Sequence, residues 1–253
     1  MIRAALVVFA LWSALPAQER IPPGSLNKAE RLEWFRDLGF GMFIHWSVDS
    51  QTGVVISHSL AGADEAYANR FFNELPKTFN PRKFYPQDWA ALAKLAGVRY
   101  VVFTTKHHSG FTMWDTRTND FGVMHTPFKR DITREILTAF SEQGIRPGVY
   151  FSPDDFWWLW KNGIDIQRNI PAVQPRNNPG LMKLDLAQVE ELMTGYGPID
   201  FVFFDGEPQQ LRDLAWKLQP DTIVTRGAIQ TPELYVPGVP LEGPWEANFT
   251  MGT

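Results

Sequence analysis

Continuous apolar segments alternate with helix-like segments along this chain, and that alternation limits the fold more than any other feature. Five segments have the apolar, β-prone composition of strands: Phe40–His45, Arg99–Lys106, Gly148–Ser152, Ile199–Phe204 and Thr222–Thr225. Strands that are apolar throughout are typical of parallel sheets covered on both faces. The pattern therefore predicts an α/β fold of repeated βα units.

Helices are predicted between these strands. The helical segments are Trp89–Ala96, Asp131–Gln143, Leu184–Thr194 and Leu211–Leu218. In the first of them, Leu92, Leu95 and Ala96 are spaced to share one face, which we expect to be its apolar side. Two further segments, Gln51–Pro86 and Phe156–Gly180, are rich in Pro, Asn and Trp and are expected to be long loops.

Two architectures fit repeated βα units: a (β/α)8 barrel of the TIM type and an open doubly wound sheet. No glycine-rich phosphate loop follows any of the predicted strands, which disfavours a nucleotide-binding open sheet. A barrel needs eight strands, and the sequence offers five. The pattern therefore favours an α/β barrel and leaves the open sheet as the alternative.

The first 17 residues have the form of a secretory signal peptide. Arg3 supplies a positive charge, Ala4–Leu15 is apolar, and Ala17 is a small residue suited to cleavage. The alternative is an N-terminal core helix. The expected organisation is a signal peptide over 1–17 and one domain over 18–253, located in the periplasm or outside the cell and free of the membrane after cleavage.

Composition excludes several classes of function. The net charge is −4, from 24 Lys and Arg against 28 Asp and Glu, so the basic surface of a nucleic-acid-binding protein is not expected. The chain has no cysteine, which excludes thiol catalysis and disulfides. Its 10 Trp, 6 Tyr and 19 Phe suit a sugar-binding protein, although a large aromatic core would explain them equally well.

Each predicted strand ends in residues capable of chemistry. These are His45 and Trp46, then Lys106 with His107 and His108, then Tyr150 and Ser152, then Asp205, and finally Arg226. The carboxyl ends of barrel strands share one face, where active sites lie. The sequence therefore predicts one pocket lined by these groups.

The chemistry of this pocket is open to more than one interpretation. His107, His108 and Asp205 are residue types that bind zinc. However, adjacent side chains of an extended strand point to opposite faces, so a shared metal ion requires a bend in the chain. Asp205 could instead cap a following loop or helix. We expect neither a metal ion nor a cofactor.

Six sequence blocks occur in a specific order and spacing: FGMFIHW at 40–46, YVVFTTKHH at 100–108, GVYFS at 148–152, FFDG at 203–206, TPE at 231–233 and WE at 245–246. In these blocks the chain resembles the retaining α-L-fucosidases of glycoside hydrolase family 29, from about Glu33 to its last residue. The resemblance implies an α/β (β/α)8 TIM-like barrel as the catalytic domain over 18–253, expected to be incomplete at its C-terminus and to lack any β-sandwich domain. It also implies a fucosylated glycan as substrate and hydrolysis by double displacement. It leaves the oligomeric state open.

The resemblance also implies roles for individual residues. Asp205 matches the nucleophile, Glu233 is the first candidate for the acid/base, and Glu246 is the alternative. Sugar contacts are implied for His45, Trp46, Glu65, His107, His108, Tyr150 and Arg226.

Three positions differ from residues that are frequent in the family. Ser109 stands in place of Asp, and Phe203 and Ala66 stand in place of Trp. The missing Trp at position 66 removes a stacking platform for the sugar, a task that the Trp157–Trp160 segment could take over. Preference for fucose over a related sugar such as α-L-galactose is therefore left open.

Three functions of different classes follow. The first is a secreted exo-glycosidase that releases terminal α-L-fucose. The second is a non-catalytic sugar-binding relative, against which the presence of Asp205, Arg226 and both glutamates argues. The third is a metal-dependent hydrolase that uses His107, His108 and Asp205, and a chelator would distinguish it from the first.

Overall fold

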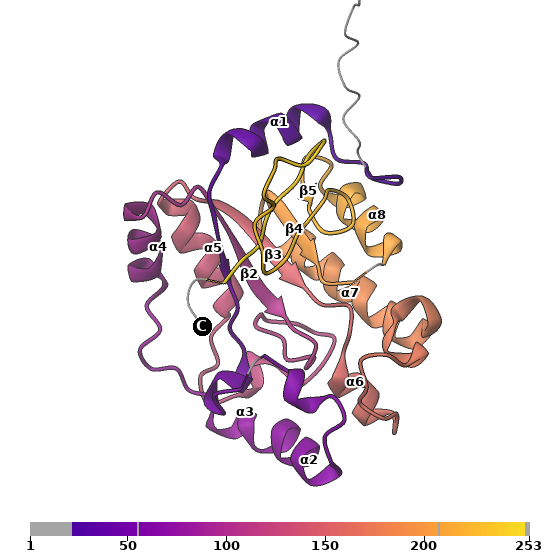
Figure 1. The fold of residues 1–253 in the computed structure, drawn as a ribbon. Coiled ribbons are helices and arrows are strands. Elements are labelled where there is room, and N and C mark those ends of the chain that lie inside the picture. The colour runs from indigo at the N-terminus through magenta and orange to yellow at the C-terminus, as the bar shows by residue number, and fades with distance from the viewer. Residues whose placement is uncertain (1–21, 55, 207, 251–253) are drawn as a thin grey trace, which may run out of the picture.

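A parallel sheet of five strands forms the centre of the computed structural model, which describes residues 22–54, 56–206 and 208–250 (Figure 1). The strands are β1 (Gly41–Ile44), β2 (Tyr100–Lys106), β3 (Arg146–Phe151), β4 (Phe201–Phe204) and β5 (Ile223–Val224). All five coincide with predicted strands. The predicted signal peptide lies outside the described residues.

The strand order distinguishes the two candidate architectures. The strands are arranged β1-β2-β3-β4-β5, and every neighbouring pair is parallel. Each new strand is thus added on the same side of the last, as in a barrel, whereas a doubly wound sheet reverses direction at a switch point. Within the described residues, β1 and β5 are not paired with each other, so the sheet is an open, incomplete barrel as expected.

Helices on the outer face connect the strands. They are α4 (Pro86–Leu95), α5 (Ile132–Glu142), α7 (Pro179–Gly195) and α8 (Gln209–Leu218), and all four were predicted. The predicted apolar side of α4 is wrong, because Leu92 and Leu95 are 65% and 86% exposed. Ala90 and Ala93 are buried instead, since small side chains let the helix backbone approach its neighbours closely.

The expected long loops contain helices. Segment 51–86 includes α2 (Glu65–Asn73) and α3 (Leu75–Thr78), and segment 156–180 begins with α6 (Phe156–Lys161). Aspartates cap two of them: Asp64 accepts a hydrogen bond from the N–H of Tyr67 at 2.7 Å, and Asp155 accepts one from Trp158 at 2.8 Å. These caps satisfy N–H groups that a helix start leaves unpaired.

Aromatic side chains fill the inner face of the sheet. Alternation along the strands turns Tyr100, Tyr150, Phe201 and Phe203 inward, where they form one buried cluster. Glycine is needed opposite them on β1, because a Cβ on Gly41 would lie 2.2 Å from the ring of Tyr100. The interior is therefore solidly packed below the carboxyl ends of the strands.

Helix α1 (Ala29–Leu38) covers the amino ends of the strands, while α2 and α3 lie at the opposite end of the molecule (Figure 1). The ring of Phe35 lies 5.1 Å from that of Phe201. Just before α1, the side chain of Asn27 accepts from the N–H of Val224 at 2.9 Å and donates to its carbonyl at 2.8 Å. Asn27 thus pairs with the free edge of β5 as a neighbouring strand would.

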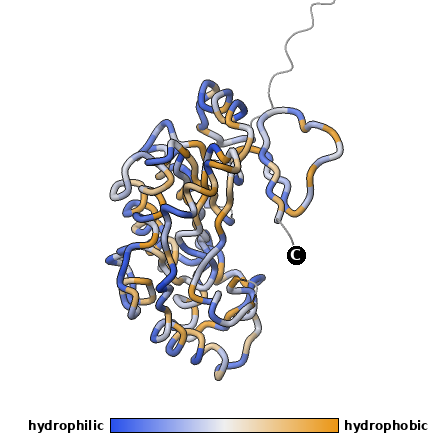
Figure 2. Tube along the Cα trace, turned by 90° about the vertical axis from the view of Figure 1, so that its left-hand side faces the viewer, coloured by the Kyte–Doolittle hydropathy of each residue, from blue (hydrophilic) through white to orange (hydrophobic). Residues whose placement is uncertain are grey.

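The segment after β5 departs from the βα pattern. Figure 2 shows it as a loop that projects from one side of the body. Several of its apolar side chains are exposed: Leu234, Tyr235, Val236, Val239 and Phe249. Among the described helices, none is both long enough and apolar enough to cross a membrane.

Candidate active site

The alternation of side chains along the strands places three predicted site residues at one end of the inner face. His45 follows inward-facing Phe43 by two positions, and Asp205 follows Phe203 in the same way. Tyr150 itself faces inward on β3, and its ring lies 5.0 Å from that of His45. The predicted convergence at the carboxyl ends of the strands is thus observed for these residues.

Asp205 is the centre of the polar network. The hydroxyl of Tyr150 donates to its Oδ2 at 2.5 Å, and Nη1 of Arg226 lies 2.8 Å from its Oδ1. Nε2 of His108 lies 3.5 Å from Oδ2. The Asp205 side chain is 21% exposed, so the carboxylate is fixed from several sides and still reaches solvent.

Glu233 shares the guanidinium of Arg226 with Asp205. The same Nη1 atom that contacts Asp205 also donates to Oε1 of Glu233. Because both carboxylates contact one nitrogen, their facing oxygens lie within about 6 Å of each other. Burial raises the pKa of Glu233, Arg226 opposes that rise, and the negative charge of Asp205 adds to it. The net shift of the Glu233 pKa is upward, which is the direction that a general acid needs.

Glu246, the alternative acid/base, is held elsewhere. It is 7% exposed and accepts a hydrogen bond from the hydroxyl of Tyr100 at 2.7 Å. Tyr100 is the first residue of β2, so this contact involves the amino ends of the strands. Burial raises the pKa of Glu246, but none of its described contacts joins it to Asp205.

Three histidines line the same region. Nδ1 of His45 is hydrogen-bonded to Thr104 at 2.7 Å, and Nδ1 of His108 to Ser152 at 2.5 Å. Burial lowers the pKa of His45 and of His108 to about 4 and that of His107 well below its usual value, although His45 keeps an exposed edge. All three are therefore neutral at pH 7, and a neutral imidazole can both donate and accept hydrogen bonds.

An irregularity in β2 brings His107 and His108 together. The register with β3 shifts between Thr104 and Lys106, and a turn follows directly, in which the N–H of Gly110 donates to the carbonyl of His107 at 2.9 Å. The two imidazole rings then lie 4.3 Å apart. Lys106 turns away into a buried cluster, where its Nζ contacts Asp185 at 2.8 Å and Asp155 at 3.4 Å. The bend that a shared metal ion would require is thus present.

Two residues of this region were not predicted. His58 lies in a short 3-10 helix (His58–Leu60), with its ring 5.8 Å from that of His107. It follows no strand, and only its residue type could have drawn attention to it. Asp154 lies 3.8 Å from Nδ1 of His108, and burial together with the charge of Asp205 raises its pKa to about 7. Its position just after β3 was a signal that the strand-end rule could have included.

Two predicted sugar contacts lie outside this network. Trp46 packs among aromatic rings, with Phe84 at 5.2 Å and Trp89 at 5.4 Å. Glu65 is the exposed first residue of α2. None of their described contacts reaches Asp205, so their roles stay predictions.

The aromatic segment that includes α6 also turns toward the protein. The Trp157 ring stacks on Phe121 at 5.9 Å, and that of Trp160 lies 5.1 Å from Phe72. These two tryptophans pack largely against the chain's own aromatic side chains. Their contacts give no support to the suggestion that they replace the missing sugar platform.

Comparisons with known proteins show which family this chain is similar to. The family model described as "Alpha-L-fucosidase" matches residues 16–253. Human tissue α-L-fucosidase is 29% identical over 202 residues, which are 72% of this chain and 41% of the human protein. The chain spans about half the length of the curated relatives it matches.

Solved structures are similar in fold as well. α-L-Fucosidase isoenzyme 1 from Paenibacillus thiaminolyticus is 26% identical, with a TM-score of 0.69 over 86% of this chain and 60% of that one. The unliganded α-L-fucosidase AlfC from Lactobacillus casei is 26% identical, with a TM-score of 0.67 over 86% of this chain and 78% of that one. A family 29 α-L-fucosidase from Bacteroides thetaiotaomicron shares the fold, with a TM-score of 0.71 at 24% identity over 88% of this chain and 60% of that one.

Proposed function

Because this chain belongs to the α-L-fucosidase family, glycoside hydrolase family 29, we propose that it is a retaining exo-glycosidase that releases terminal α-L-fucose from glycans. The observation that carries the proposal is the pair of carboxyl groups on one guanidinium. Arg226 contacts both Asp205 and Glu233, at the carboxyl ends of the strands. Active sites of barrel enzymes lie at that end.

The separation of the two carboxyl groups supports retention of configuration. In retaining glycosidases they lie about 5–5.5 Å apart, whereas inverting enzymes need about 6.5–9.5 Å to admit a water molecule. The two oxygens that contact one nitrogen of Arg226 lie within about 6 Å of each other, which favours the shorter spacing. Asp205 and Glu233 therefore suit a double displacement.

In the first step, an oxygen of Asp205 attacks the anomeric carbon while Glu233 gives its proton to the departing glycosidic oxygen. The carbon–oxygen bond to the aglycone breaks, and a glycosyl ester of Asp205 forms. In the second step, Glu233 removes a proton from water, and the resulting hydroxide displaces Asp205 to release the sugar. Protons and bonds balance over the two steps, and no cofactor takes part.

Neighbouring groups have roles consistent with this chemistry. The Tyr150 hydroxyl and Arg226 hold Asp205 in one orientation. Neutral His45, His107 and His108 can bind sugar hydroxyls as donors or acceptors. A mutant of the relative AlfC is known in complex with 4-nitrophenyl α-L-fucopyranoside, at 26% identity to this chain, which supports an α-L-fucoside as substrate here.

Glu246 is the alternative acid/base in this proposal. For it to act, the segment after β5 would have to repack so that Glu246 leaves Tyr100 and approaches Asp205. We also propose that residues 1–17 direct secretion and that residues 18–253 form the catalytic domain, on the basis of the apolar run at Ala4–Leu15.

The decisive experiment is release of 4-nitrophenol from its α-L-fucoside by the purified chain and by Asp205→Ala. We expect turnover by the first and a loss on the order of 10⁴-fold or more in the second, as for removal of a covalent nucleophile. Equal turnover by both would refute the role of Asp205. A folded wild-type chain that binds fucose without turnover would favour the non-catalytic alternative.

The acid/base is identified with two leaving groups. Glu233→Ala should hydrolyse 4-nitrophenyl fucoside at a modestly reduced rate, because that leaving group needs little protonation. The same variant should be severely impaired on a methyl or disaccharide fucoside. Glu246→Ala is the matched comparison, and the same pattern in that variant in place of Glu233→Ala would reassign the role.

A further inference from the structure

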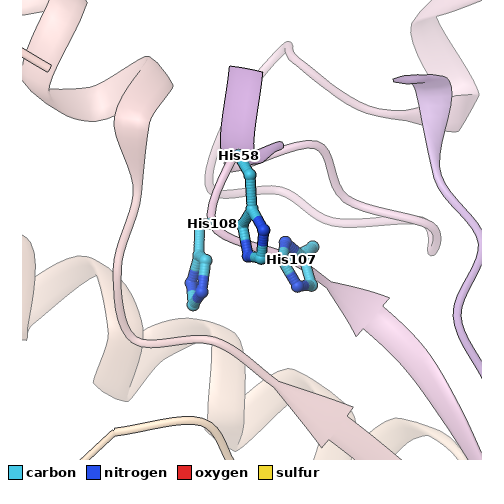
Figure 3. Close-up of side chains that lie close together, drawn as sticks. All are labelled: His58, His107 and His108. Atoms are coloured by element: carbon cyan, nitrogen blue, oxygen red, sulfur yellow. The ribbon is translucent and has the colours of Figure 1, made fainter. Parts of the chain in front are cut away.

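Three imidazoles from two separate segments meet beside the proposed active site. Figure 3 shows the rings of His58, His107 and His108 converging on a common space. Each offers a nitrogen, and these ligand atoms all lie within 4.8 Å of one another. His58 comes from the 3-10 helix before α2, and the other two come from the bend after β2.

Hydrogen bonds at the far side of two rings fix their orientation. Nδ1 of His107 is bonded to the hydroxyl of Ser57 at 3.0 Å, and Nδ1 of His108 to that of Ser152 at 2.5 Å. The Ser57 backbone in turn donates to buried Asp49 at 2.5 Å. Since these bonds engage Nδ1, Nε2 is the nitrogen that each ring offers to a ligand, and that of His108 also lies 3.5 Å from Asp205. Histidines that bind metals are oriented by the same kind of outer hydrogen bond.

We propose that His58, His107 and His108 bind a divalent transition-metal ion such as Zn²⁺ or Co²⁺, which competes with the sugar for the pocket. Imidazole nitrogen is a preferred ligand of these ions, and three protein ligands leave the fourth position to water. The proposal goes beyond the hydrolytic function, in which no metal takes part, and its binding test does not depend on that function.

The geometry requires a modest closure of the site. Tetrahedral zinc with bonds of about 2.0–2.1 Å places neighbouring nitrogens about 3.3 Å apart. The three ligand nitrogens now lie within 4.8 Å of one another, so at least one ring must shift by about 1–2 Å to bind the ion. His58 is the ring suited to move, because its side chain is exposed while His107 and His108 are buried. Exposure of His58 also provides the route by which an ion enters.

The proposed ion would occupy space that the sugar needs. Nε2 of His108 lies 3.5 Å from Asp205, so a metal on this nitrogen sits next to the proposed nucleophile. Its positive charge would attract the Asp205 carboxylate and reduce the availability of that group for attack. Sugar and metal should therefore exclude each other.

The test is titration of the metal-free full chain with Co²⁺, followed by visible absorption. Tetrahedral binding should give intense d–d bands at one equivalent. His58→Ala should weaken binding by more than about 100-fold, since loss of even an outer hydrogen-bond partner costs about 10–100-fold. His125→Ala is the matched control, because this exposed histidine lies in another 3-10 helix, Val123–His125. Its binding should equal that of the wild type.

Three results would overturn the proposal: no cobalt bands in the wild type, equal binding by His58→Ala, or equal weakening by His125→Ala. Near-ultraviolet circular dichroism checks that each variant is folded, and His108→Gln provides a second variant within the cluster. Excess α-L-fucose should displace Co²⁺, and persistence of the bands would refute competition. Cobalt binding by a chain that lacks fucosidase activity would support the metal site. Only the proposed hydrolytic function would then be contradicted.

Discussion

Replacement of Asp154 by Asn should change the pH dependence of stability in a defined direction. Burial and the charge of Asp205 raise the pKa of Asp154 from 3.8 to about 7. Between about pH 4 and 7, the folded chain therefore keeps a proton on this carboxyl, whereas the unfolded chain has lost it. A group of this kind favours the folded state at low pH, and the advantage disappears as the pH rises through 7.

The size of the effect follows from the same values. One pH unit corresponds to about 1.4 kcal/mol, and the two pKa values differ by about three, which gives an upper limit of about 4 kcal/mol. The side chain is 20% exposed, so solvent screening reduces the expected value to about 2–4 kcal/mol. Asn has nearly the same shape and does not titrate. Asp154→Asn should therefore be more stable than the wild type at pH 8 by this amount and nearly equal to it at pH 4.

Urea denaturation at pH 4, 6 and 8 measures the difference directly. Asp165→Asn is a suitable control, because Asp165 is exposed and the substitution removes the same charge. That variant should differ little from the wild type at any pH. A difference between Asp154→Asn and wild type that stays constant from pH 4 to 8 would refute the reasoning, since the folded pKa would then be normal.

Three further substitutions test the scaffold. Lys106→Met leaves two buried carboxyl groups without their cation. It should lower the free energy of unfolding, measured by urea denaturation, by about 3–5 kcal/mol. A decrease below about 1 kcal/mol would contradict the importance of this buried cluster. Asn27→Ala removes both hydrogen bonds to Val224 and should cost about 1–3 kcal/mol, which thermal unfolding would detect as a lower Tm. Gly41→Ala places a Cβ 2.2 Å from the ring of Tyr100 and should cost about 1–3 kcal/mol, whereas a neutral effect would mean that the ring moves freely.

The strands were predictable because burial on both faces leaves a continuous apolar signal. Phe201–Phe204 has no polar residue, and the chemistry-bearing Asp205 follows at once. The alternation of side chains then determines that Asp205 and Tyr150 share the inner face. For these residues, the alternation in the sequence predicts correctly which face of the sheet each side chain occupies.

The helices near the site were harder to predict, because their signals compete. The aromatic run of α6 has strand-forming residues, and its helical character depends on the cap at Asp155. In α4, the spacing of Leu92 and Leu95 indicated a buried face, but packing was decided by small alanines. Periodicity reports which residues share a face and does not report how closely a neighbour can approach.

The two glutamates illustrate a further limit. Glu233 and Glu246 are 13 positions apart in a segment with no regular pattern. In such a segment, sequence spacing does not indicate the direction in which a side chain points. The structure turns one toward Arg226 and the other toward Tyr100. His58 was missed for the same reason, because its approach to His107 depends on a loop and not on a strand.

The pairing of Asn27 with Val224 also has a consequence for the order of folding. The two residues are 197 positions apart, so the contact cannot form during synthesis until almost the whole of the described chain has been made. Helix α1 also packs on this late region, since its Phe35 lies against Phe201 as well as against Tyr100 of β2. The first helix that the structure describes therefore completes its packing only late in synthesis. Until then the apolar side of α1 needs protection, because an exposed apolar surface on an emerging chain promotes aggregation.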